Sequence, residues 1–151
     1  MERSLHNQAV IVGIGQTEFT KNSGRSELAL AAECVKNAID DAGLSPADID
    51  GMSAFTLDNT DEIELARTLG IPQLTFWGRI PYGGGAAVGI VHQAAMAVAT
   101  GAAKYVVGYR ALNGRSGQRY SMGVSGDIVT SDLVHWGYYM PSGLLTPASW
   151  V

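Results

Sequence analysis

The chain alternates apolar runs with amphipathic stretches, a pattern that predicts strands followed by helices. The continuous apolar run at residues 9–14 predicts a buried strand. Apolar residues then recur at helical spacing over 28–42. Ser26 stands before that stretch as an N-cap and Gly43 stands where a C′ glycine would end it. The first third of the chain is therefore expected to fold as a strand, a loop and a helix.

The same alternation continues through the middle of the chain. A helix capped by Asn59 or Thr60 is expected to end at Gly70, and a helix apolar on nearly every side, hence buried on every side, is expected over 86–100. Ser45-Pro46 starts a short helical turn. Three more strands are predicted, at 51–57, 74–80 and 104–111. Strands alternating with helices indicate an α/β fold, with a mixed or parallel sheet covered by helices on both faces.

Composition narrows the class of protein. The 151 residues are 46% hydrophobic and 16% charged, an ordinary balance for one globular domain. The net charge of -4 and the lack of a basic run give no electrostatic footprint for nucleic acid. One cysteine allows no intrachain disulfide, and no apolar run reaches the roughly 18–20 residues that cross a bilayer. With no signal peptide visible, a cytoplasmic protein without a membrane partner is expected.

The end of the sequence also carries a prediction. Thr146 and Pro147 form a good helix start, but only the four residues 148–151 follow. One helical turn does not stand alone. The natural protein is therefore expected to continue beyond this chain.

Several segments resemble the N-terminal half of the thiolase superfamily over residues 8–151. DAGLSPADIDG at 41–51 and ATGAAKYVVGYRA at 99–111 carry this resemblance. The chain looks most like the lipid-transfer-protein group related to sterol carrier protein-x thiolases. That closer match lies in NSGRSELALAAE, YGGGAA, MAVATG and YRALNGRSG, at 22–33, 82–87, 96–101 and 109–117.

The resemblance implies a domain organisation and a reaction. It implies a thiolase-like core at 1–112 and, at 113–151, the truncated start of a loop region that covers the acyl pocket. Members of this group act in bacterial steroid side-chain degradation. The implied reaction is retro-aldol cleavage of a steroid β-hydroxyacyl-CoA thioester, with CoA as part of the substrate and no bound cofactor. The catalytic histidine and second cysteine positions of thiolases lie in the C-terminal half, so the catalytic base is unknown here.

The sequence departs from thiolases where their nucleophilic cysteine stands. Counting back from Gly101, the resemblance places that position at Gly84, and glycine has no nucleophile for covalent acyl transfer. The turn of Gly83, Gly84, Gly85 and Ala86 nevertheless precedes a helix, whose free amides favour an anion. Such amides suit the oxygen of an enolate. The alternative is a turn that only requires positive φ.

Further pocket candidates come from aromatic and histidine residues. Tyr82 precedes the glycine turn and is either an acid or hydrogen-bond donor, or a packing residue. His135, Tyr138 and Tyr139 lie in the region that covers the acyl chain in thiolases. They either line a steroid pocket or form an aromatic surface for a partner.

Other residues favour structural interpretations. His92 is expected to be a hydrogen-bonded core histidine, and Cys34 a small buried or half-buried side chain. Gly13 and Gly15 lack the third glycine of a dinucleotide-binding loop, which excludes that motif. Three arginines either approach CoA phosphates or are solvated: Arg110, Arg115 and Arg119.

Assembly and rival functions follow from the same resemblance. The strand at 74–80 matches the thiolase strand that pairs across a two-fold axis, which implies a homodimer. Members of the steroid group also associate with a partner protein that has an OB fold and a zinc ribbon. The alternatives are a non-catalytic acyl-CoA or lipid carrier, a scaffold subunit, or a thiolase-type acyltransferase in name only. Polar or apolar pocket residues in the C-terminal half would distinguish an enzyme from a carrier.

Overall fold

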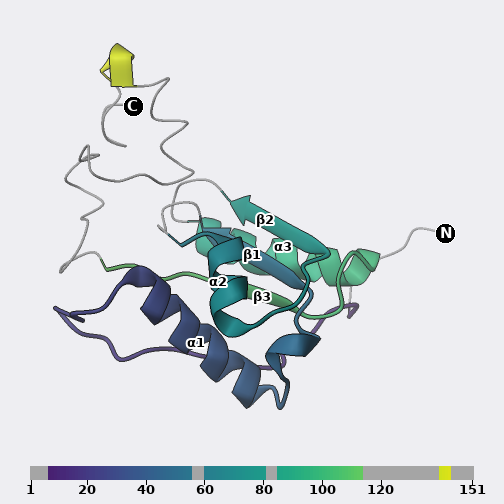
Figure 1. Cartoon of the computed structure of the whole chain (residues 1–151). Coiled ribbons are helices and arrows are strands. Elements are labelled where there is room, and N and C mark those ends of the chain that lie inside the picture. Colours follow the sequence, from purple (N-terminus) through teal and green to yellow (C-terminus); the bar gives the residue numbers. More distant parts are fainter. Residues whose placement is uncertain (1–6, 56–59, 81–84, 114–139, 144–151) are drawn as a thin grey trace.

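The computed structural model describes residues 7–55, 60–80, 85–113 and 140–143. Three helices and three strands alternate along it, with two short 3-10 turns (Figure 1). In chain order the elements are α1 (Glu27–Asp41), η1 (Pro46–Asp48), β1 (Gly51–Phe55), α2 (Glu62–Leu69), β2 (Phe76–Ile80), α3 (Ala86–Thr100), β3 (Val106–Tyr109) and η3 (Met140–Ser142). Nearly all of 113–151 lies outside the described residues, so the division at residue 112 stays a prediction.

The strands form a parallel sheet in the order β2-β1-β3. β1 is the central strand and all five of its residues are buried. Figure 1 shows α1 and α2 on one face of the sheet and α3 on the other, and α3 contacts all three strands. Parallel strands joined by crossover helices, with both faces covered, are the arrangement that the sequence pattern predicts.

Helix α1 begins and ends at the residues that the sequence indicates. The Ser26 hydroxyl accepts a hydrogen bond from the Ala29 amide at 3.2 Å, and Gly43 has a φ of 67° after the helix. Its apolar side faces the core through Leu30, Ala31, Val35 and Ile39. Local capping signals and one apolar stripe are therefore sufficient to define this helix.

Replacing Ser26 with alanine is expected to destabilise the fold by about 1 kcal/mol, because the Ala29 amide loses its acceptor. Urea unfolding followed by circular dichroism measures the change. Ser26→Asp, which keeps an acceptor at the N-cap, is the matched control and should unfold close to the wild type. Equal midpoints for the alanine variant and the wild type would contradict the capping role.

The apolar run at 9–14 differs from its prediction. It belongs to no strand among the described residues, and Val10, Ile11, Val12 and Ile14 are 53 to 80% exposed. The prediction of a buried strand is wrong because no described strand pairs with the run. Instead the segment lies against α1, where the Ile14 amide donates to Asp41 at 2.9 Å.

Helix α3 has its predicted bounds but not its predicted burial. Gly101 ends it with a φ of 76°. Ile90 and Ala97 face the core, whereas Val88 and Val91 are 73% and 47% exposed. The expectation of burial on every side is wrong because the sheet covers only one side of the helix.

Smaller expectations divide in the same way. Cys34 is half-buried, and its thiol donates to the Ala31 carbonyl, which confirms a packing role. His92 is exposed on α3, so the expected core histidine is wrong. The N-cap of α2 is Asp61, not Asn59 or Thr60. Within the described ranges, no helix has the length and apolar character needed to cross a membrane.

Candidate functional site

The start of α3 lies where the strands of the sheet end. Because the strands are parallel, their carboxyl ends at Phe55, Ile80 and Tyr109 share one edge, the usual place for ligand sites in such sheets. Gly85 is the N-cap of α3 and makes no side-chain cap. The first amides of a helix have no acceptor within the helix, and those of Ala86 and Ala87 belong to the first turn of α3.

The backbone at Gly85 does not itself require glycine. Its φ is -75°, a value open to any residue, and a Cβ built there would meet no heavy atom of the described residues within 4 Å. The alternative interpretation, a glycine required only for positive φ, therefore does not apply at Gly85. Lack of a side chain at Gly85 adds no bulk to this end of the helix.

The predicted site is described only in part. Gly85 and Ala86 lie at the start of α3, as expected. The other predicted residues lie outside the described residues, and so do Arg115 and Arg119. Those predicted site residues are Gly83, Gly84, Tyr82, His135, Tyr138 and Tyr139.

A charged cluster that the sequence reasoning missed lies at the same edge of the sheet. Arg79, at the end of β2, donates from Nε and Nη2 to Oε2 of Glu62 at 3.0 and 2.6 Å, and from Nη2 to Asp61 at 2.6 Å. The Glu62 side chain is 8% exposed. Burial alone lowers the pKa of Arg79, but hydrogen bonds and charges from the two carboxylates offset this and raise it above its usual value. The cluster joins β2 to the start of α2.

Two further contacts order the end of β3. The Tyr109 hydroxyl, buried, donates to the Thr60 carbonyl at 2.9 Å. The Arg110 guanidinium lies over the ring of Phe55, 4.6 Å from its centroid. This contact holds the Arg110 cation near the carboxyl edge of the sheet. Its approach to CoA phosphates stays a prediction.

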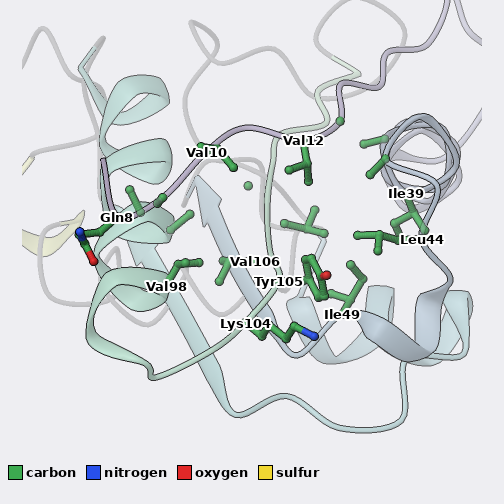
Figure 2. A pocket seen from close by; sticks show the side chains of 18 of the residues that line it. Gln8, Val10, Val12, Ile39, Leu44, Ile49, Val98, Lys104, Tyr105 and Val106 are labelled. Carbon is green, nitrogen blue, oxygen red and sulfur yellow. The ribbon is translucent and has the colours of Figure 1, made fainter. Parts of the chain in front are cut away.

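Two cavities lined by described residues lie away from the start of α3. Figure 2 shows one of about 330 Å³ between the N-terminal run, with Val10 and Val12, and the amino end of β3, with Tyr105 and Val106. A second, of about 390 Å³, lies beside the loop at 15–23 and the segment 110–113. Neither is lined by Gly85 or Ala86.

Among the described residues, no three His, Cys, Asp or Glu side chains are grouped so that they could hold a metal ion. The described polar groups at this edge include backbone amides, the Arg110 cation, and the Arg79 cation with its two carboxylate partners. Amides at a helix N-terminus bind negative charge on oxygen.

No family model matches the chain. It is 56% identical over 149 residues to a steroid side-chain-cleaving aldolase of Thermomonospora curvata. It is 54% identical over 149 residues to a 17-hydroxy-3-oxo-4-pregnene-20-carboxyl-CoA lyase of Mycobacterium tuberculosis. Each match takes in 97% of this chain, which spans only 38% and 39% of the lengths of these relatives.

A comparison with solved structures also finds an aldolase. A structure named Ltp2-ChsH2(DUF35) aldolase superposes with a TM-score of 0.71 at 55% identity, over 93% of this chain and 35% of that one. Over nearly its whole length the chain is therefore similar to one part of these aldolases. A priming β-ketosynthase of the R1128 polyketide pathway shares the fold alone, with a TM-score of 0.51 at 17% identity over 64% of this chain and 32% of that one. The resemblance and the α/β fold class predicted from the sequence are both confirmed.

Proposed function

We propose that the full-length protein containing this chain is an aldolase that cleaves a carbon–carbon bond in a steroid side chain carried as a β-hydroxyacyl-CoA thioester. The observation that carries the proposal is the place of the start of α3, at the carboxyl edge of the sheet, where Gly85 is the N-cap and the amides of Ala86 and Ala87 belong to the first turn. The names of the two curated relatives, an aldolase and a CoA lyase, support the same reaction class.

The proposed reaction needs a base and a stabiliser for negative charge. A base takes the proton of the β-hydroxyl, the bond between the α and β carbons breaks, and the β carbon becomes a carbonyl. The bonding electrons pass to the α carbon and the thioester oxygen as an enolate, which is then protonated at the α carbon. The amides of Ala86 and Ala87 are suited to hold that oxygen. The base is proposed to come from outside the described residues.

Glycine at position 84 is consistent with this chemistry. A retro-aldol step forms no acyl-enzyme, so it needs no nucleophile at the start of the helix. CoA is part of the substrate in this proposal, and no bound cofactor takes part. A thiolase-type acyl exchange through residue 84 would require the cysteine that this sequence lacks.

The proposal extends to assembly and location. β2 is an outer strand of the described sheet and its Trp77 is 62% exposed, which supports pairing of β2 with a second copy. The name of the Ltp2-ChsH2(DUF35) aldolase pairs that relative with a second component. We propose a corresponding OB-fold, zinc-ribbon partner for this protein, and a cytoplasmic location.

The test is an assay of the full-length protein, alone and with its partner, on a steroid β-hydroxyacyl-CoA thioester. Cleavage into a steroid ketone and a shortened acyl-CoA is expected, measured by mass spectrometry. Binding of the thioester without cleavage under both conditions would instead identify an acyl-CoA carrier. No binding and no cleavage would leave a scaffold subunit.

A bulky residue in the glycine turn is expected to block the site. Gly84→Leu should lower kcat/KM by about 100-fold, the effect of losing one oxyanion contact, because the side chain fills the space for the thioester. Val88→Leu introduces the same side chain at a position 73% exposed on α3 and should leave the kinetics unchanged. Unchanged kcat and KM in Gly84→Leu would show that the turn does not line the substrate.

A further inference from the structure

A row of small residues crosses the sheet beneath α3. Ser53 of β1 pairs in register with Gly78 of β2 on one side and Gly108 of β3 on the other. Ser53 is fully buried. With two glycines and a serine across three adjacent strands, α3 can lie close to the backbone of the sheet.

One polar side chain of α3 reaches into this row. The Ser53 hydroxyl donates a hydrogen bond to Oε1 of Gln93 at 2.6 Å. A Cβ built on Gly78 would lie only 2.5 to 2.6 Å from the amide atoms of the same Gln93 side chain. Gln93 therefore occupies the space that any side chain at position 78 would need.

The contact of α3 with Gly108, next to Ser53 in the same row, is apolar and leaves more space. A Cβ on Gly108 would lie 3.8 Å from the Ile90 side chain, an ordinary contact distance. Apolar contacts of this kind tolerate sliding, whereas a hydrogen bond has one donor and one acceptor at fixed positions. A shift of α3 by one residue would move Gln93 by about 1.5 Å and 100° around the helix and break its bond to Ser53.

We propose that Ser53 and Gln93, seated on Gly78, are positioning residues that fix the rotation and height of α3 and so aim the amides of Ala86 and Ala87 at the substrate. Gln93 lies about 10 Å along the helix from those amides. The helix is rigid over that distance, so its register at Gln93 sets the place of its first turn. This inference rests on the proposed function of the helix start.

A purely stabilising role would have a different signature. Replacing both partners of a buried polar pair by apolar groups is close to neutral for stability, whereas removing one partner leaves the other unsatisfied. Buried polar contacts are best attested as devices that fix register. Stability and positioning therefore separate in a double variant.

The experiment uses the full-length protein with Ser53→Ala, Gln93→Leu and both together. Each single variant is expected to lower kcat by about tenfold to 100-fold, as small misplacements of catalytic groups do, with little change in KM. The double variant should recover the wild-type Tm but not its kcat. Val35→Ala, on the buried side of α1, is the stability control and should lower Tm while keeping kcat.

A pair of glycine variants tests whether the space above Gly78 is needed for Gln93. Gly78→Ala should displace Gln93 and lower kcat, and Gly108→Ala, the same change in the same row, should keep it. Recovery of kcat in the Ser53→Ala, Gln93→Leu double variant would overturn the proposal. So would equal loss of kcat in Val35→Ala, because activity would then follow stability alone.

Hydrogen exchange keeps this inference separate from the proposed function. If the wild type cleaves no steroid thioester, the proposed function fails, and exchange at the start of α3 still tests the register. The Val88 and Gly89 amides donate to the Gly85 carbonyl at 3.1 and 2.9 Å. They should exchange faster in Gln93→Leu and at the wild-type rate in Val35→Ala. Unchanged exchange in Gln93→Leu would overturn the positioning role.

Discussion

Replacing Arg79 with methionine is expected to lower the free energy of unfolding by about 3–5 kcal/mol, the cost of breaking a buried ion pair. The reason lies in Glu62, whose side chain is 8% exposed and receives two hydrogen bonds from the Arg79 guanidinium. Methionine keeps much of the apolar part of the arginine side chain but removes the guanidinium, so the buried Glu62 carboxylate loses both of these hydrogen bonds. The free energy of unfolding of a domain is about 5–15 kcal/mol in total, so this variant would lose a large part of its stability. Urea unfolding followed by circular dichroism measures the change.

Asp61 provides the matched control for that variant. It accepts from the same guanidinium at 2.6 Å, but its side chain is 53% exposed. Asp61→Asn is expected to cost less than about 1 kcal/mol, as exposed ion pairs do. The double variant Arg79→Met with Glu62→Leu should recover most of the stability, because no buried charge remains. A loss in Arg79→Met no larger than in Asp61→Asn would show that the cluster is not a buried ion pair in solution.

Local signals were sufficient for the bounds of α1 and α3. The bounds of α3 were predicted at both ends, because Gly85 precedes the apolar run and Gly101 follows it in the left-handed conformation. Ser26 before α1 and Gly43 after it likewise predicted the two ends of that helix. Caps and stop residues act within one helical turn, so a single sequence contains them in full.

Burial was harder to predict, because it depends on elements distant in the sequence. The run at 9–14 has the composition of a core strand, yet a strand is stabilised only by a paired neighbour, and none of the described strands pairs with it. His92 lies in an apolar sequence but on the side of α3 that faces away from the sheet. Hydropathy alone does not tell which side of a helix is covered.

The candidate site shows the same division. Gly85 and Ala86 were found by counting along a family pattern, and the structure places them at a helix start as expected. The Arg79–Glu62 pair and the Ser53–Gln93 pair were missed, because their members are 17 and 40 residues apart. No periodicity links such residues, and only the crossing of strand and helix brings them together.

Gly15→Ala is expected to destabilise the chain by about 3 kcal/mol, the upper end of the usual cost of overpacking. A Cβ at this position would lie 2.0 Å from the Cys34 carbonyl oxygen and 2.5 Å from the Ala38 amide nitrogen, both backbone atoms of α1. Backbone atoms inside a helix do not move aside as a flexible side chain does. The segment at 13–16 would therefore separate from α1 and lose the contact that holds it there. Thermal unfolding followed by circular dichroism measures this loss.

Gln16→Ala is the control, since Gln16 is exposed and the hydrogen bond that it accepts from the Asn37 side-chain amide, at 3.2 Å, goes to its backbone carbonyl. Its Tm should stay close to the wild type. A Tm for Gly15→Ala equal to that of Gln16→Ala would mean that the segment does not lie against α1 in solution. The expected result would also explain why two glycines stand in VGIGQTE without a dinucleotide motif. Gly13 approaches the Ala38 carbonyl in the same way, so both glycines serve close packing on a helix.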